Sequence, residues 1–389
     1  MPPVYLDNAA STRVSEPVLA VMVEVMRTAW GNPSSQHPQG AAARGHLETA
    51  RRRLLGALGD TPGDGRIGDI VWTSGCTEAD ALAVLGAARI RPGSIVVSSI
   101  EHAAVGALAA KLGESRAAVF VEPGPDGVIA PEVVARAAHG AAVVSIVMVQ
   151  NEIGVIQPVA AIARAVRAIN PACHLHLDAA QAFGKVAIDV AALGVDSIAI
   201  AGHKVHGPKG IGALWLRTGV VLEPLWVGGG QQGGLRGGTQ DAPSAAGFGL
   251  AAEYAAASLS ATRTRWLSLA ARITARLRDR GVGFHQLVPD PLRSPHILAL
   301  GITGVPANAL RTVLASRGVY ISTGSACATH DGHGKPSAVL VAIGVHPDTG
   351  MCRLSFGHDT TEDDVDLAAD ALADVALELV RSPREHSPQ

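Results

Sequence analysis

The chain has 389 residues, of which 48% are hydrophobic and 17% charged, and its formal net charge is −2. A chain of this length can bury a large core, and its composition excludes a disordered or fibrous protein. A charge so close to zero provides no strong field toward nucleic acid or anionic lipid, so direct binding to either is not expected.

The start of the sequence and its cysteines predict a cytoplasmic protein. The first residues, MPPVYLDNAAST, lack a basic segment followed by an apolar one, so no secretion signal is predicted. The longest apolar stretch, residues 141–149, is too short to span a bilayer. The cysteines form no Cys-x-x-Cys pair, which is typical of reduced thiols; they are Cys76, Cys173, Cys327 and Cys352.

Apolar runs alternate with helix-like stretches from about residue 66 to 217. The runs are continuously apolar rather than alternating, which indicates a mostly parallel sheet covered on both faces. We therefore predict an α/β fold with a mostly parallel seven-stranded sheet. The predicted strands are residues 69–74, 94–100, 117–122, 141–149, 173–178, 197–202 and 212–217.

The remaining third of the chain predicts a second, smaller α/β unit. A glycine-rich segment is followed by an alanine-rich helical pattern from about residue 245 to 280. Residues 296–304 and 320–330 resemble strands, and residues 361–382 form an amphipathic pattern whose Thr361 and following acids suit a helix start. We predict a large domain of residues 14–257, and a small domain of residues 1–13 and 258–389.

Polar residues follow five of the predicted strands. In parallel α/β sheets ligands bind outside the carboxyl ends of the strands, so these side chains should converge. They are Gly75, Cys76 and Thr77; Glu101 and His102; Gln150, Asn151 and Glu152; Asp178 and Gln181; and His203 and Lys204. A lysine, a carboxylate and a glycine before a helix start suit pyridoxal 5'-phosphate. Its aldehyde needs an amine, its ring nitrogen a carboxylate, and its phosphate backbone N–H groups.

Ten motifs, in order along nearly the whole chain, resemble those of the cysteine desulfurases, which are fold-type I, class V pyridoxal-phosphate enzymes. The motifs are LDNAAST (6–12), GNPSS (31–35), TSGCTEAD (73–80), EHAAV (101–105), NEIGVIQPV (151–159), HLDAAQAFGK (176–185), AGHKVHGPKGIGALW (201–215), LRGGT (235–239), STGSAC (322–327) and RLSFG (353–357). The resemblance implies a fold-type I architecture and removal of sulfur from L-cysteine, giving L-alanine.

The resemblance assigns roles to the residues of these motifs. Lys204 is implied as the Schiff-base lysine, and its place after a strand and two small residues agrees; Lys209 lies in a turn, where an ordinary exposed lysine is expected. Asp178 is implied as the partner of the ring nitrogen and Gln181 as that of the phenolic oxygen. His102 would stack on the ring and move protons.

The phosphate end and the substrate are assigned in the same way. Gly75 and Cys76 would bring backbone amides to the phosphate, which Thr77 and His203 would bind, with Thr239 reaching in from a second subunit of a homodimer with shared sites. Asn151 and Arg353 would bind the α-carboxylate of cysteine, although a buried structural role for Arg353 is an alternative. No metal is predicted.

Cys327 is implied as the sulfur acceptor within the protein. Its thiolate would take the substrate's sulfur as a persulfide and pass it to an acceptor protein. The destination (iron–sulfur cluster assembly, tRNA thiolation, DNA phosphorothioation or thio-metabolite synthesis) stays open, as does preference for sulfur or selenium. Neighbouring His330, His333 and Lys335 could raise the thiolate fraction. The other three cysteines are predicted to be packing residues, with Cys76 the least secure because it adjoins the phosphate loop.

Four alternatives accompany this interpretation. The chain could be a related pyridoxal-phosphate C–S lyase or aminotransferase without a persulfide, or a catalytically inactive sulfur-relay or scaffold protein. Cys327, His330 and His333 could instead bind zinc, but a glycine-rich loop is a poor rigid site. A Gly-x-Gly-x-x-Gly pattern at residues 228–233 is followed by more loop, which disfavours a dinucleotide site.

The chain also departs from the family pattern. Ala201 replaces a usual serine, which removes one phosphate hydroxyl, and Ala81 replaces a common asparagine. The loop beyond Cys327 is about two residues longer than in the subgroup that it most resembles, which leaves the sulfur acceptor open.

Overall fold

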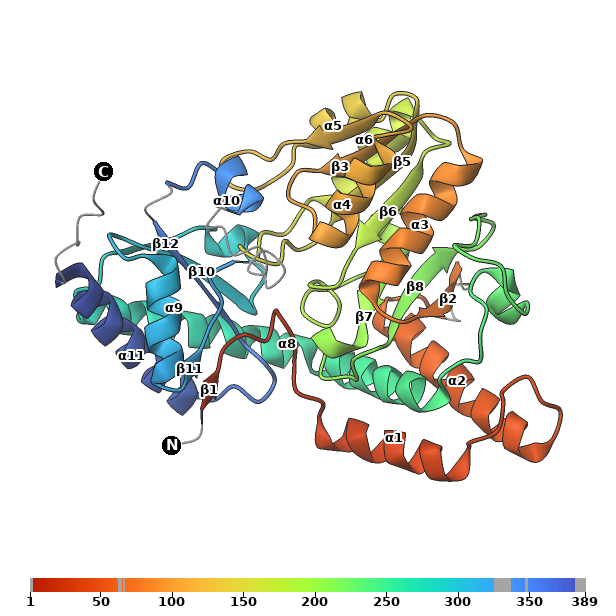
Figure 1. Cartoon of the computed structure of the whole chain (residues 1–389), viewed down its shortest axis with the longest axis horizontal. Helices are drawn as coiled ribbons and strands as arrows, with labels where there is room; N and C mark the ends of the chain where they lie inside the picture. The colour runs from red at the N-terminus through yellow and green to blue at the C-terminus, as the bar shows by residue number, and fades with distance from the viewer. Residues whose placement is uncertain (1–2, 62–64, 66, 325–336, 347–348, 382–389) are drawn as a thin grey trace.

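A computed structural model describes residues 3–61, 65, 67–324, 337–346 and 349–381 (Figure 1). The described residues form a central seven-stranded sheet in the order β2-β8-β7-β6-β5-β3-β4. Its strands are β2 (Gly68–Thr73), β3 (Ser94–Ser98), β4 (Ala118–Val121), β5 (Ala141–Val147), β6 (His174–Asp178), β7 (Ser197–Ala201) and β8 (Gly212–Arg217).

Only β8 of these seven described strands runs against the others. It pairs antiparallel with both β2 and β7, whereas the pairs from β7 to β4 are parallel. Because β2 and β7 both oppose β8, they share one direction, and the carboxyl ends of six strands lie at the same edge of the sheet. The predicted mostly parallel seven-stranded sheet is confirmed.

Helices cover both faces of the central sheet. Successive strand residues point to opposite faces, so Val96 and Val144 belong to one buried cluster while Val97 and Val143 belong to another. Helices α3 (Cys76–Ile90) and α4 (Ala103–Leu112) contribute to the second cluster. The opposite face packs against α2 (Pro38–Ala57), α5 (Pro131–Ala137), α6 (Val159–Ile169) and the first half of α8 (Ala242–Asp279). Shorter or peripheral helices are α1 (Glu16–Thr28) and α7 (Val190–Leu193).

A second group of elements lies at the other end of α8, which runs along both parts of the molecule in Figure 1. The described strands there are β9 (Phe284–Gln286), β10 (Ile297–Ile302) and β12 (Gly350–Ser355), with β10 in the middle of an antiparallel sheet, and the parallel pair β1 (Val4–Tyr5) and β11 (Val319–Tyr320). The helices are α9 (Ala307–Ser316), α10 (Ala338–Ala342) and α11 (Glu362–Arg381).

A separate buried cluster unites this second group. It joins Val4 and Leu6 of the N-terminal segment to Trp266 and Leu277 of α8 and to residues of α11 such as Leu372. The cluster favours the division predicted at residues 13/14 and 257/258. The boundaries themselves stay a prediction, because α8 crosses the second of them without interruption.

The C-terminal part differs from the sequence prediction at β9, which was not predicted, and at two further strands. Of the strand predicted at residues 320–330, the described portion contributes only Tyr320, in β11, and residues 325–330 lie outside the described residues. Strand β12 was not predicted as a strand. The helix start predicted at Thr361 is found, since the Thr361 N–H donates to Asp364 Oδ2 (2.9 Å) and the Asp364 N–H donates to Thr361 Oγ1 (3.1 Å). Among the described helices, none is long and apolar enough to cross a membrane.

Candidate active site

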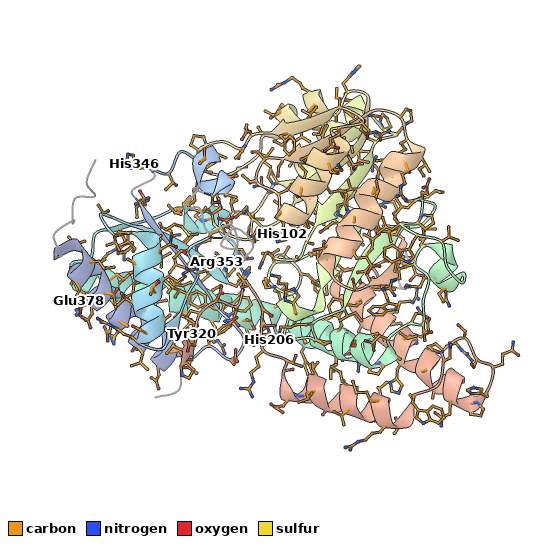
Figure 2. The ribbon with its side chains drawn as sticks, in the orientation of Figure 1. His102, His206, Tyr320, His346, Arg353 and Glu378 are labelled. Atoms are coloured by element: carbon orange, nitrogen blue, oxygen red, sulfur yellow. The ribbon has the colours of Figure 1, made fainter. Side chains whose placement is uncertain are left out.

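The five predicted strand ends meet in one pocket of about 450 Å³ at the carboxyl edge of the central sheet. His102 and Arg353, which line it, lie near the middle of the molecule in Figure 2, between the two groups of elements. Ten of the twelve predicted site residues line the described part of this pocket: Gly75, Cys76, Thr77, His102, Asn151, Asp178, Gln181, His203, Lys204 and Arg353. The structure brings these residues together, and their individual roles stay predictions.

Lys204 lies on a short 3-10 helix (Gly202–Lys204) directly after β7. Its Nζ donates to the carbonyl oxygens of Ala9 (2.7 Å) and Ala10 (2.9 Å), both of which also line the pocket. Burial, and next the charge of Arg353, lower the pKa of Lys204 to about 8. Because the neutral amine is the nucleophilic form, this environment suits a lysine that reacts with an aldehyde.

Asp178 and Gln181 occupy the end of β6 and the turn after it. Asp178 is buried, and its Oδ1 accepts from the Ala180 N–H at 2.9 Å. Gln181 Nε2 donates to the Ala9 carbonyl at 2.7 Å, and Gln181 Oε1 lies 3.1 Å from His296 Nε2. Because both Gln181 and Lys204 donate to the Ala9 carbonyl, the N-terminal segment and the sheet together position these two donors.

The two pocket histidines are neutral at neutral pH. His102 begins α4, and its Nδ1 accepts from the Ala104 N–H at 3.1 Å, which leaves the ring proton on Nε2. Burial lowers the pKa of His102. Burial, and next the charge of Lys204, lower the pKa of His203 to about 4, and its Nδ1 lies 3.2 Å from Ser11 Oγ.

The first turn of α3 opens into the pocket through Gly75, Cys76 and Thr77. Its N-cap residue is Gly75, and no described side chain caps this helix start. A Cβ at Gly75 would meet no atom within 4 Å, whereas a Cβ at Gly212 would come within 2.6 Å of the Gly75 backbone. Strand β8 therefore packs tightly against a helix start whose first N–H groups are open to an anion.

These observations fit pyridoxal phosphate. The pocket has an amine without a carboxylate partner among its hydrogen bonds at Lys204, a buried carboxylate at Asp178 and an uncapped helix start for the phosphate. An imidazole at His102 lines the same space.

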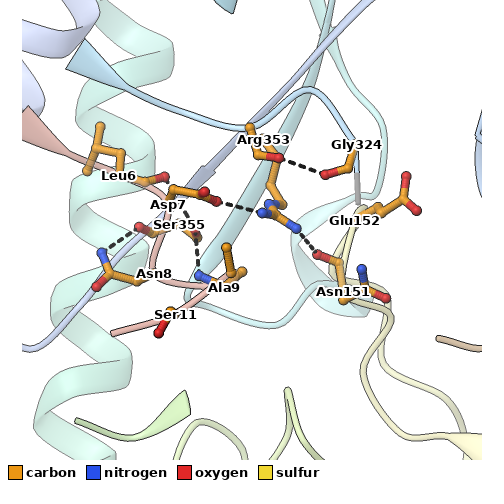
Figure 3. A network of polar contacts seen from close by, with 12 residues as sticks. Leu6, Asp7, Asn8, Ala9, Ser11, Asn151, Glu152, Gly324, Arg353 and Ser355 are labelled. Atoms are coloured by element: carbon orange, nitrogen blue, oxygen red, sulfur yellow. Dashed lines mark hydrogen bonds and ion pairs between the residues drawn. The ribbon is translucent and has the colours of Figure 1, made fainter. Parts of the chain in front are cut away.

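Arg353 reaches the pocket from β12, in the second group of elements (Figure 3). Its side chain is buried, and its terminal nitrogens donate to the Asn151 carbonyl (2.7 Å) and to Asp7 Oδ1 (2.6 Å). Its buried Nε has no hydrogen-bond partner among the described residues. A guanidinium with unused donor capacity beside Asn151 can bind a carboxylate.

Three pocket features were not predicted from the sequence. Asp7 pairs with Arg353, and Asp80 lines the pocket floor beside Cys76. Lys209 is exposed as predicted but lines the pocket as well. Its place on the turn between β7 and β8, five residues after Lys204, was the available signal, since that turn begins at the carboxyl edge of the sheet.

The cysteines divide into two groups. Cys173 and Cys352 are buried, and burial raises the pKa of each thiol to about 12, as suits packing residues. Cys76 instead lines the pocket, with its Sγ 3.6 Å from Asp178 Oδ1, and burial raises its pKa well above the ordinary value. The pocket position departs from a purely packing role for Cys76.

Two predicted site residues are not in the described pocket. Thr239 is exposed and is not among the residues that line it. Cys327 lies outside the described residues, as do His330, His333 and Lys335. The flanks of that segment are described. Ser322 exchanges backbone hydrogen bonds with Arg353, and a side-chain hydrogen bond joins Ser337 to the buried Glu152.

Comparison with known proteins gives concordant matches. Residues 4–367 match the family model described as aminotransferase class-V. A curated cysteine desulfurase of Gluconacetobacter diazotrophicus is 37% identical, over 99% of this chain and 95% of its own. A solved NifS-like protein is 32% identical with a TM-score of 0.88, covering 97% of this chain and 100% of its own. A structure named SspA in complex with cysteine is 30% identical with a TM-score of 0.76, covering 90% of this chain and 98% of its own.

Proposed function

The chain belongs to the aminotransferase class-V family and to the cysteine desulfurases within it, and from that premise we propose how its residues take sulfur from L-cysteine and release L-alanine. The observation that carries the proposal is the convergence of Lys204, Asp178 and Arg353 on one pocket. An amine, a carboxylate and a guanidinium are the groups needed for an aldehyde cofactor, its ring nitrogen and an amino-acid carboxylate.

Pyridoxal phosphate, on which the class V family depends, supplies an electron sink for the substrate's α-carbon when it is bound. Lys204 would hold its aldehyde carbon, Asp178 its ring nitrogen and Gln181 its phenolic oxygen. Thr77, His203 and the first N–H groups of α3 would hold the phosphate. The neutral imidazole of His203 suits a hydrogen-bonding role there rather than an ion pair, because its pKa is lowered to about 4, first by burial.

Arg353 and Asn151 bind the substrate's α-carboxylate in this proposal. Asp7 already neutralises part of the Arg353 charge, and Nε provides a donor that has no partner among the described residues. Lys204 Nζ then accepts the α-proton in its neutral form, whose fraction at neutral pH is increased by the lowered pKa. His102 carries a proton on Nε2 and can donate it within the pocket.

Cys327 receives the sulfur in the step that breaks the Cβ–S bond of the substrate. Its thiolate attacks the sulfur of the substrate, so that an S–S bond forms and the Cβ–S bond breaks. The electron pair of the broken bond stays on Cβ, which a proton then completes to the methyl group of alanine. The described residue Ser322 supports this assignment. Its backbone is hydrogen-bonded to that of Arg353, and it lies five residues before Cys327. A sulfur-acceptor protein then takes the sulfur from the persulfide.

The activity test combines two cysteine variants with one lysine variant. With L-cysteine and a reductant, the protein should form alanine and sulfide in equal amounts. Lys204→Ala should abolish both products, and Cys327→Ser should lower sulfide release by about 100-fold or more. Cys173→Ser is the matched control, because the Cys173 thiol lies in the core and is not among the residues that line the pocket.

The outcomes separate the alternatives. Pyruvate and ammonia in place of alanine, with full activity in Cys327→Ser, would establish a C–S lyase and overturn the persulfide step. No product from a protein that binds pyridoxal phosphate would favour the inactive scaffold.

We also propose a homodimer in which Thr239 binds the phosphate in the partner's site. The exposed position of Thr239 supports this role, as do the neighbouring apolar side chains of Trp226 (49% exposed) and Val227 (94% exposed). Light scattering should give about twice the chain mass of 39.7 kDa. Thr239→Ala should weaken pyridoxal phosphate binding by about 10-fold, whereas the exposed Thr264→Ala should not. A fully active monomer would contradict the proposal.

A further inference from the structure

A line of buried polar side chains leads away from the pocket floor between β6 and β7. His174, His176 and Asp178 alternate along β6 and therefore share one face of the sheet. Ser197 begins β7 directly opposite His176. The side chains of both histidines, Ser197 and Asp80 are almost completely buried, so their polar atoms have to find partners within the protein rather than in water.

The contacts of this line are continuous. His176 Nε2 lies 3.0 Å from Asp80 Oδ1, and His176 Nδ1 lies 2.8 Å from Ser197 Oγ. Ser197 Oγ also lies 2.8 Å from His174 Nε2. At the pocket end, Cys76 Sγ lies 3.9 Å from Asp80 Oδ1 and 3.6 Å from Asp178 Oδ1. The proposed partner of the cofactor's ring nitrogen is thus one thiol away from Asp80.

The charge beside the far end of the line favours one direction for these hydrogen bonds. Burial lowers the pKa of His176 to about 3 and that of His174 well below its ordinary value, so each ring carries one proton. His174 Nδ1 lies 3.9 Å from Asp196 Oδ2, and that carboxylate is paired with Arg167 at 2.6 Å. A lone pair facing this carboxylate is repelled and an N–H is attracted. His174 Nδ1 has no hydrogen-bond partner among the described residues, so this electrostatic preference alone places the His174 proton on Nδ1.

The positions of the remaining protons follow because each hydrogen bond needs one donor and one acceptor. His174 Nε2 must accept, so the Ser197 hydroxyl donates to it. Ser197 has one proton and now needs a donor for its lone pair, which is His176 Nδ1–H. His176 Nε2 must then accept from Asp80 Oδ1, and an oxygen can donate only if the carboxyl is protonated.

We infer that Ser197, His176 and His174 form a relay that holds a proton on Asp80, and that these positioning residues thereby leave Asp178 as the ionised carboxyl for the cofactor. The relay stands on this structure alone, and only its consequence for Asp178 rests on the proposed function. The surroundings of Asp80 agree, since burial, and next Asp178 and Glu101, raise its pKa well above the ordinary value.

The same assignment of protons explains why Cys76, Asp80 and Asp178 can lie close together. Their polar atoms are within 4.8 Å of one another. With Asp80 protonated and donating to His176, the Cys76 thiol is free to donate to Asp178 Oδ1. That oxygen already accepts from the Ala180 N–H. Asp178 Oδ1 then accepts from both groups.

The test is a measurement of histidine tautomers. In protein labelled with nitrogen-15 histidine, long-range nitrogen–proton correlations distinguish Nδ1–H from Nε2–H, and His174→Gln and His176→Gln variants assign the two signals. Both rings should be neutral Nδ1–H tautomers at neutral pH. An Nε2–H tautomer or an imidazolium at His176 would overturn the relay. Should the variants not fold, neutron diffraction from the unaltered protein reads the same protons directly.

A matched pair of serine variants tests whether the relay sets this state. Ser197→Ala removes the link, so His176 should change to Nε2–H and donate to an ionised Asp80. Ser145→Ala is the control, because Ser145 is a buried serine opposite His176 on the other neighbouring strand, and its hydroxyl has no partner within the described part of the chain. His176 should stay Nδ1–H in that variant. An unchanged tautomer in Ser197→Ala would overturn the proposal. The tautomers are read without turnover, so failure of the desulfurase assay would leave this result distinguishable.

Discussion

Arg353 is among the largest side chains that are fully buried in the described structure. Removing a guanidinium from water costs several kcal/mol, which a partner carboxylate and well-placed hydrogen bonds must offset. Asp7 and the Asn151 carbonyl satisfy two nitrogens, whereas Nε has no partner in the described part of the chain. A purely structural arginine gains nothing from an unpaired N–H, so the substrate's carboxylate is the better explanation for it.

This argument predicts a specific kinetic defect. Arg353→Lys keeps the charge but loses the planar fork, so KM for L-cysteine should rise and kcat/KM should fall by about 10- to 100-fold. Arg293→Lys is the matched control. Arg293 is also buried and paired with a carboxylate, that of Asp290 at 2.9 Å, and it is not among the residues that line the pocket. The Arg293→Lys substitution should lower the melting temperature without changing KM for L-cysteine. An unchanged KM in Arg353→Lys would establish the structural role instead.

At the scale of elements, the central strands were predictable because each is a continuous apolar run between helices. All seven appear in the structure within about two residues of the predicted bounds. Strand β12 was missed because its six residues, GMCRLS, include Arg353, which reads as a polar interruption. Its burial comes from pairing along the whole of β10 and from Asp7, which are contacts that a local pattern cannot report.

The residues of the candidate site likewise divide into those that the sequence could predict and those that it could not. Residues at strand ends could be predicted because topology alone collects them, as Asp178 and Lys204 illustrate. The partners that tune them could not be predicted, because Asp7 reaches Arg353 and Asp80 reaches His176 only through tertiary packing.

Helices α8 and α11 are joined by surface ion pairs whose residues are not among those that line the pocket. Arginines at four-residue spacing on α8 face aspartates at the same spacing on α11, for example Arg272 with Asp366 and Arg280 with Asp374. These pairs are largely exposed, so each adds little to stability and salt screens it. They align the two helices, whereas the buried cluster around Trp266 supplies most of the stability of this part.

At the scale of the whole molecule, the pocket exists only where the two groups of elements meet. Ala9 and Ser11 come from the N-terminal segment, Arg353 from β12 and Lys204 from the central sheet. The same junction contains the buried His206, whose Nδ1 donates to the Arg13 carbonyl (2.9 Å) and whose Nε2 accepts from the His358 N–H (3.1 Å). Burial lowers the pKa of His206, which keeps Nε2 free to accept.

Buried neutral histidines are numerous in the described structure and make its stability depend on pH. Burial lowers the pKa of seven of them: His102, His174, His176, His203, His206, His296 and His358. In the unfolded chain each imidazole has a pKa of about 6.5. Below that pH the unfolded state binds more protons, so the free energy of unfolding falls as the pH falls.

Three buried carboxyls oppose this trend, because burial raises the pKa of Asp80, Glu101 and Glu152 and the folded state keeps their protons. The histidines outnumber these carboxyls, so unfolding should take up protons at about pH 5.5. Urea midpoints should therefore decrease steadily from pH 6.5 to about pH 4, where His203 and His358 begin to titrate in the folded state. His206→Gln should reduce the uptake, because burial lowers the pKa of His206 in the folded state. Stability that rises on acidification would show that these histidines are charged in the folded protein, and would remove the basis for the tautomers of the relay as well.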